Sequence, residues 1–131
     1  NGYNVGIFSN MSEMALQILT QRFPEIFETY GGPQVYSFSL KSVKPDIEGY
    51  SKIDELGYPS VTFIDDKESY LRTGIENFGW NGVLFTPYID LDEAIRAKHN
   101  NTTKPTKNFR IADSINGLEK ALKHFGLEIS R

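Results

Sequence analysis

Short apolar runs alternate along this chain with segments of helical periodicity, and this alternation constrains the fold more than any other feature. Each run is bounded by Gly, Pro, Asn or Ser, as strands usually are. The four predicted strands are Val5–Phe8, Val35–Phe38, Val61–Ile64 and Val83–Phe85. Strands that alternate with helices form βα units around a parallel sheet covered on both faces. We therefore predict an α/β protein with a Rossmann-like parallel sheet and helices on both faces.

Four helices are predicted from apolar residues that recur every three or four positions. Their apolar faces are Met11, Ala15, Ile18 and Leu19; Ile47, Tyr50 and Ile53; Leu71, Gly74, Ile75 and Phe78; and Ile115, Leu118, Leu122 and Phe125. The first helix is predicted to have Asn10 or Ser12 as its N-cap. Gly57, Gly79 and Gly126 are predicted to end helices, because glycine readily adopts the left-handed conformation found there.

Residues 88–131 are predicted to form an extension to a partial core at residues 1–87. Residues 91–98 suggest a short helix, and residues 99–108 are rich in Asn, Thr and Lys, which is typical of an exposed loop. The last helix, capped by Asp113 or Ser114, is predicted to pack on the core.

The composition limits what the chain can bind. Its 131 residues, 39% hydrophobic and 13% aromatic, are enough for one domain with an ordinary core. A net charge of −3 gives no general attraction for nucleic acid or an anionic membrane, and no apolar run approaches the roughly 20 residues that span a bilayer. The lack of cysteine excludes disulfides and thiol chemistry. We predict a cytoplasmic protein with neither nucleic-acid nor membrane partners.

Polar side chains of complementary chemistry lie directly after two of the predicted strands and just before one of the predicted helices. Asp65 and Asp66 follow the third predicted strand, where adjacent carboxylates commonly hold a metal ion. Ser9 and Asn10 follow the first strand, and Lys44 stands just before the second helix. Open α/β sheets bind ligands outside the carboxyl ends of their strands. The hydroxyl, ammonium and carboxylate groups together predict a site for phosphate and a divalent cation.

The order of these motifs resembles that of the haloacid dehalogenase (HAD) superfamily of phosphatases and related hydrolases. The matching segments are Gly6-Ile7-Phe8-Ser9-Asn10, Val43-Lys44-Pro45-Asp46 and Phe63-Ile64-Asp65-Asp66, and the resemblance extends from about Asn1 through Thr86. Within the superfamily, the chain is most similar to the branch that contains alpha-D-glucose-1-phosphate phosphatases and sugar phosphatases. Any one of the motifs is weak, and the ordered set is what carries the resemblance.

The resemblance implies a Mg²⁺-dependent phosphatase acting on a small phosphorylated substrate. In the family, an Asp on the first strand attacks phosphorus, and a second Asp two residues later protonates the leaving group. The resemblance assigns Asp66 as a metal ligand and Asp65 as a ligand or its anchor. It implies that Ser9, with the Asn10 backbone, binds a phosphoryl oxygen and that Lys44 balances the charge of the nucleophile and phosphoryl group.

Two departures from the family pattern bear on activity. No Asp-x-Asp motif precedes Ser9, and the one at Asp90-Leu91-Asp92 comes after the other motifs. The family's first strand lies between the strands of the second and fourth motifs, so its absence implies a missing central strand. We expect a segment before Asn1 or a companion chain to supply it, and this chain alone to be inactive. The second departure is Tyr70, which stands where relatives often carry Asp or Asn.

Other interpretations stay open at this point. The chain could be a catalytically inactive HAD-like domain that serves in binding or assembly. A haloacid dehalogenase needs no Mg²⁺, which the acid pair argues against, and a receiver-like signalling domain has its motifs in a different order. Asp65 and Asp66 could also simply cap the following helix. His99 and His124 are predicted to lie outside the site, and the basic residues Lys98, Lys104, Lys107 and Arg110 to be solvated.

Overall fold

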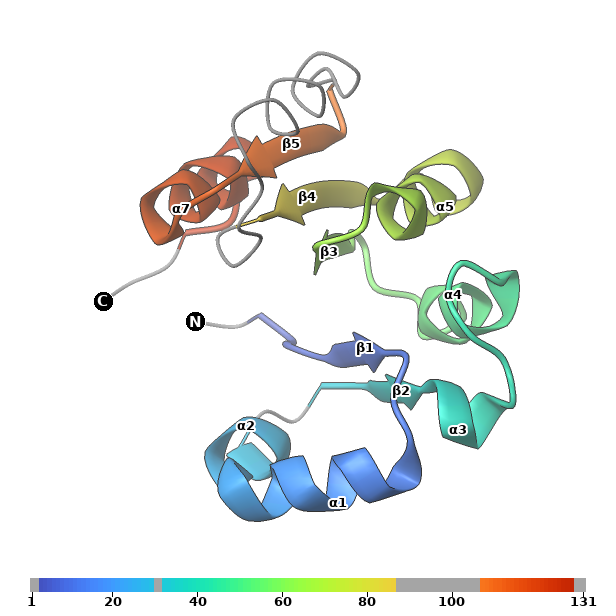
Figure 1. Cartoon of the computed structure of the whole chain (residues 1–131). Coiled ribbons are helices and arrows are strands. Elements are labelled where there is room, and N and C mark those ends of the chain that lie inside the picture. The colour runs from blue at the N-terminus through green and yellow to red at the C-terminus, as the bar shows by residue number, and fades with distance from the viewer. Residues whose placement is uncertain (1–2, 30–31, 87–106, 129–131) are drawn as a thin grey trace, which may run out of the picture. The chain divides into compact units, whose positions relative to one another are not determined.

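The computed structural model describes residues 3–29, 32–86 and 107–128, and the chain divides into two compact units, Asn1–Tyr58 and Pro59–Arg131 (Figure 1). Each unit contains an open sheet of parallel strands accompanied by helices, which confirms a mixed α/β fold. The predicted helix at 91–98 and most of the predicted loop at 99–108 lie outside the described residues. Within the described ranges, every helix is too short or too polar to cross a membrane.

The Asn1–Tyr58 unit contains a two-stranded parallel sheet. Its elements are β1 (Ile7–Ser9), α1 (Glu13–Arg22), α2 (Pro24–Thr29), β2 (Gln34–Tyr36), α3 (Ser37–Leu40) and α4 (Ile47–Asp54). Phe8 lies opposite Val35 in the β1–β2 register, and Ser9 lies opposite Tyr36. Parallel strands need a long crossover connection, which α1 and α2 provide here.

The predicted end of the second strand, at Phe38, is wrong. The strand stops at Tyr36, and Ser37 begins α3. A short apolar run does not by itself distinguish a strand from a helical turn. Here the Ser37 hydroxyl hydrogen-bonds the backbone of Met11, which fixes the chain at the point where it turns into α3.

The core of this unit is small and centres on α4. Tyr50 is fully buried, and the Phe8 ring meets it edge-on with centroids 4.9 Å apart. Gly49 makes this approach possible, because a Cβ there would lie 2.6 Å from the Phe8 ring. The predicted inward position of Ile47 is wrong, since this residue in the first turn of α4 is 47% exposed.

No residue of α1 is buried, and Ile18 on its predicted apolar face is 50% exposed. Within its unit α1 packs mainly on α2. The predicted helix is confirmed, and so is its N-cap, Ser12. The Ser12 hydroxyl oxygen accepts a 3.1 Å hydrogen bond from the Ala15 N–H. The sequence pattern therefore predicted the helix and its start correctly.

The Pro59–Arg131 unit contains a three-stranded parallel sheet in the order β3-β4-β5. Its elements are β3 (Thr62–Asp65), α5 (Glu68–Phe78), β4 (Asn81–Phe85), β5 (Phe109–Ala112) and α7 (Ile115–His124). Strand β5 was not predicted, because Arg110 interrupts a four-residue run that follows a polar stretch. Tertiary pairing with β4 and the complete burial of Phe109 define it as a strand.

Helices α5 and α7 cover opposite faces of this sheet. A Cβ at Gly82 of β4 would meet Ile75 and Leu71 of α5. The next residue, Val83, clusters instead with Leu122 of α7, together with Ala112 and Ala121. Because neighbouring residues of a strand point to opposite faces, the two helices must lie on different sides. The prediction that the last helix packs on the sheet is confirmed, although Ile115 in its first turn is 57% exposed.

The glycines predicted to end helices all adopt the left-handed conformation. Their φ angles are 77° at Gly57, 70° at Gly79 and 82° at Gly126. Ser114 caps α7, and its hydroxyl accepts a 3.0 Å hydrogen bond from the Gly117 N–H. These local signals were predictable because they depend on residues within one helical turn.

Candidate functional site

Lys44 is the most unusual polar residue of the Asn1–Tyr58 unit, because it is only 7% exposed. It lies between α3 and α4, and its ammonium donates a 3.1 Å hydrogen bond to the Phe8 carbonyl oxygen, one residue before the end of β1. Its Nζ also lies 5.0 Å from the centre of the Phe8 ring. These contacts place Lys44 beside the strand that ends in Ser9, and exclude a fully solvated surface lysine.

Asn10 connects the end of β1 to the backbone of Lys44. Its Oδ1 accepts a 2.8 Å hydrogen bond from the Lys44 N–H, and its Nδ2 donates a 3.3 Å hydrogen bond to the Lys44 carbonyl oxygen. The Lys44–Pro45 peptide bond is cis. The structure therefore brings together Ser9, Asn10 and Lys44, the three predicted site residues of this unit.

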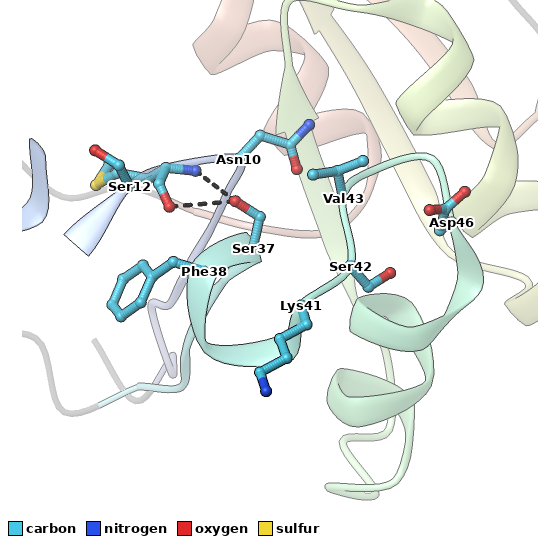
Figure 2. Close-up of a pocket in the computed structure, with 9 residues that line it drawn as sticks. Asn10, Ser12, Ser37, Phe38, Lys41, Ser42, Val43 and Asp46 are labelled. Atoms are coloured by element: carbon cyan, nitrogen blue, oxygen red, sulfur yellow. Dashed lines mark hydrogen bonds between the residues drawn. The ribbon is translucent and has the colours of Figure 1, made fainter.

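Ser37 holds the same loop from another side. Its hydroxyl accepts a 2.8 Å hydrogen bond from the Met11 N–H and donates a 3.2 Å bond to the Met11 carbonyl oxygen (Figure 2). The two residues are 26 positions apart, and Ser37 was expected within a strand. The sequence alone does not identify Ser37, because a single serine carries no signal of a distant backbone partner.

A shallow depression of about 610 Å³ adjoins this loop (Figure 2). It is lined by Asn10, Met11, Ser12, Ser37, Phe38, Lys41, Ser42, Val43 and Asp46. Its three hydroxyl groups are engaged within the protein, since Ser42 donates a 2.9 Å hydrogen bond to Glu48 and the other two bond the backbone. Asn10 is the only predicted site residue in this lining.

Asp65 and Asp66 lie at the end of β3 in the Pro59–Arg131 unit. Asp65 is the last residue of the strand, and its Oδ1 accepts hydrogen bonds of 2.7 Å from the Asp66 N–H and 3.1 Å from the Lys67 N–H. Lys67 is the N-cap of α5. Asp65 thus orders the turn between β3 and α5, whereas the N-cap position of α5 belongs to Lys67. Asp66 is the more exposed of the two carboxylates.

The Asp66 carboxyl is perturbed by its neighbour Asp65. A hydrogen bond with the Asp65 side chain, partial burial and the negative charge of Asp65 together raise the pKa of Asp66 above its ordinary value. Two carboxylates held this close bind a proton more readily than one alone. A divalent cation would relieve the same repulsion without protonation.

The pair fits part of a Mg²⁺ site. Magnesium prefers oxygen ligands in octahedral geometry and often takes only one or two carboxylates from the protein. No group of three or more His, Asp or Glu side chains suited to a metal occurs in the portion of the chain that the structure describes. Asp65 and Asp66 would therefore hold the ion together with ligands from elsewhere. Tyr70, on α5, supplies no carboxylate, and its ring lies 5.3 Å from Lys67 Nζ.

Among the residues predicted to lie outside the site, Lys107 is exposed as expected, whereas Arg110 is part of β5 and is half-buried rather than solvated. His124 Nε2 lies 2.7 Å from Arg110 Nη2, which links α7 to β5. His99, Lys98 and Lys104 lie outside the described residues.

The predicted site residues are divided between the two units. Ser9, Asn10 and Lys44 belong to the first and Asp65 and Asp66 to the second, and in each unit a parallel strand ends at polar groups. Comparison with known proteins found no matching family model, curated protein or solved structure.

Proposed function

We propose that this chain is the carboxyl-terminal part of a Mg²⁺-dependent HAD-like phosphatase with a Rossmann-like core, which acts on small phosphomonoesters in the cytoplasm. The observation that supports this most is the buried Lys44, whose ammonium is anchored at the end of β1. An ammonium shielded from water interacts more strongly with an anion than a solvated one does. A phosphoryl group next to Ser9 would be such an anion.

The described residues have separate roles in this proposal. The Ser9 hydroxyl donates a hydrogen bond to a phosphoryl oxygen, and Lys44 neutralises negative charge that develops during transfer. Asp65 and Asp66 would hold Mg²⁺, and the ion would supply neutralisation of phosphoryl charge when bound. Asp65 also keeps Asp66 in place, because it orders the turn that carries both.

The nucleophile in this proposal is an Asp on a strand that precedes Asn1 or belongs to a companion chain. It attacks phosphorus to give an aspartyl-phosphate, and water then hydrolyses that intermediate. Among the described residues β1 pairs only with β2, and β3 only with β4. Each sheet therefore has an edge to which a further strand can add through backbone hydrogen bonds.

The first test is mass spectrometry and sequencing of the whole preparation, to find the polypeptide that precedes or accompanies this chain. An apolar strand followed by Asp-x-Asp is expected. The protein that contains it should release phosphate from a small phosphomonoester with Mg²⁺ and lose this activity in EDTA. Ser9→Ala and Lys44→Met should each lower kcat by a factor on the order of 100. Ser42→Ala is the matched control, because it removes a nearby hydroxyl bonded to Glu48.

Full activity of Lys44→Met, or equal activity with EDTA, would contradict the proposal. The second candidate, a catalytically inactive binding or assembly domain, is favoured by the lack of any Asp-x-Asp before Ser9. It predicts that the preceding sequence also lacks this motif. In that case the protein would show no phosphate release with any phosphomonoester tested.

A further inference from the structure

We propose that the side chain of Asn10 is a positioning residue that holds Lys44 in place. The resemblance assigned Asn10 to phosphoryl binding through its backbone and gave its side chain no role. The structure engages both polar atoms of this side chain with the backbone of Lys44. The importance of this contact for phosphoryl transfer rests on the proposed function, whereas the contact itself does not.

The geometry of the amide determines its orientation. A carboxamide offers an acceptor on one side and a donor on the other, and here they face the N–H and C=O of a single residue. The reversed amide would place oxygen against oxygen and nitrogen against N–H, so both hydrogen bonds would be lost. Asn10 therefore matches the Lys44 backbone in one orientation only.

The ammonium and the backbone of Lys44 are both hydrogen-bonded to the same short segment, Phe8–Asn10. The Phe8 carbonyl accepts the hydrogen bond from the ammonium, and Asn10 holds the backbone. A lysine side chain has many rotamers, and fixing the backbone from which it extends limits the region that its ammonium can reach. Asn10 thus helps to position the Lys44 ammonium by holding the Lys44 backbone.

The segment that carries Asn10 is itself anchored. The next residue, Met11, is bound through both its N–H and its carbonyl oxygen by the Ser37 hydroxyl (Figure 2). Asn10 therefore has a fixed base from which to hold Lys44. Functional groups held by a second layer of hydrogen bonds keep the geometry that transfer reactions need.

The test compares the rate at which an amine-reactive ester acylates each lysine of the full chain, measured by mass spectrometry. In Asn10→Ala the rate at Lys44 is expected to rise about tenfold, because the loss of both hydrogen bonds makes local opening easier. The rates at Lys41 and Lys52, which are exposed, should not change. Because both are already accessible, Lys41 and Lys52 serve as internal references for the reactivity of an exposed lysine.

Ser12→Ala is the matched control variant. It lies in the same loop and loses its hydrogen bond to the Ala15 N–H without contacting Lys44. An unchanged Lys44 rate in folded Asn10→Ala, or an equal rise in Ser12→Ala, would overturn the proposal. If Asn10→Ala does not fold, Asn10→Asp replaces it, because it keeps the acceptor for the Lys44 N–H and sets a charged oxygen in place of the Nδ2 donor, against the Lys44 carbonyl oxygen. Lys44 should again be acylated faster.

This readout separates the positioning role from the proposed function. Acylation needs neither Mg²⁺ nor a substrate, so it can be measured in a protein without phosphatase activity. If the protein contains the preceding Asp-x-Asp segment and still releases no phosphate, a selective rise at Lys44 supports the role of Asn10 and counts against the phosphatase. In an active protein, Asn10→Ala should lower kcat by about the same factor as Lys44→Met, and the two changes together should be less than additive.

Discussion

Replacing Gly74 with alanine is expected to destabilise the protein by about 2 kcal/mol, because the new methyl group would overlap Trp80. A Cβ at Gly74 would lie 2.5 Å from Cε3 of the Trp80 ring and 3.2 Å from two further ring atoms. Trp80 is 3% exposed, and its ring contacts those of Phe63 and Phe78 at centroid distances of 6.0 and 5.5 Å. The indole therefore has little room to move away.

The magnitude follows from two opposing terms. Overpacking a core costs about 1 to 3 kcal/mol, and an overlap this close places the cost near the upper limit. Alanine is favoured over glycine inside a helix by about 1 kcal/mol, which offsets part of that cost. The net loss is then about 2 kcal/mol, large enough to measure by urea unfolding.

Trp80 provides the signal for this experiment, since it is the only tryptophan of the chain. Its fluorescence should report unfolding at the site of the substitution. Gly117→Ala is the control, because Gly117 lies in α7 of the same unit and its Cβ would be 3.2 Å from Ser114 Oγ and 3.6 Å from Ala112 Cβ. Alanine is favoured in the helix by up to about 1 kcal/mol, and the small shift required of the capping Ser114 hydroxyl offsets part of this, so stability should change by less than about 1 kcal/mol in either direction. If Gly74→Ala is as stable as the unmodified protein, the ring can shift and the packing argument fails.

Three further predictions concern charge, the metal and a helix cap. Asp66→Asn should raise the free energy of unfolding at neutral pH. Because the pKa of Asp66 is raised in the folded protein, the protonated Asp66 carboxyl stabilises the fold. This contribution is fully present below the pKa that Asp66 has in the unfolded chain, and it is lost as the pH rises through the pKa that Asp66 has in the folded protein. The difference in the free energy of unfolding between Asp66→Asn and the unmodified protein should therefore shrink as pH falls. A difference that grows toward acid pH would contradict the raised pKa. Mg²⁺ should raise the unfolding midpoint of the unmodified protein at neutral pH and EDTA should reverse the rise, whereas an equal rise in Asp66→Asn would exclude that carboxylate as a ligand. Ser114→Ala should cost about 1 kcal/mol in urea unfolding because α7 loses its N-cap, and Ser114→Thr, which keeps the hydroxyl, should restore most of it; equal losses in both would refute the cap assignment.

Much of the candidate site was predictable, because its residue types follow apolar runs directly in the sequence. Ser9 and Asp65 each lie at the last position of a strand, where the prediction placed them within a residue. The burial of Lys44 and its contacts with Phe8 and Asn10 were not predictable. They depend on residues 34 and 36 positions away, and no local pattern records such a separation.

The sequence by itself determined the alternation of strands and helices, the helix caps and the glycines at the helix ends, because each depends on neighbours within a few residues. Only the tertiary structure decided which apolar residues are buried, since Ile47 and Ile115 follow the helical period and are still exposed. It also decided that Phe109–Ala112 is a strand, through pairing with β4. The physical reason is the same throughout: propensity and capping act along the chain, whereas burial and strand pairing require partners brought together from distant parts of it.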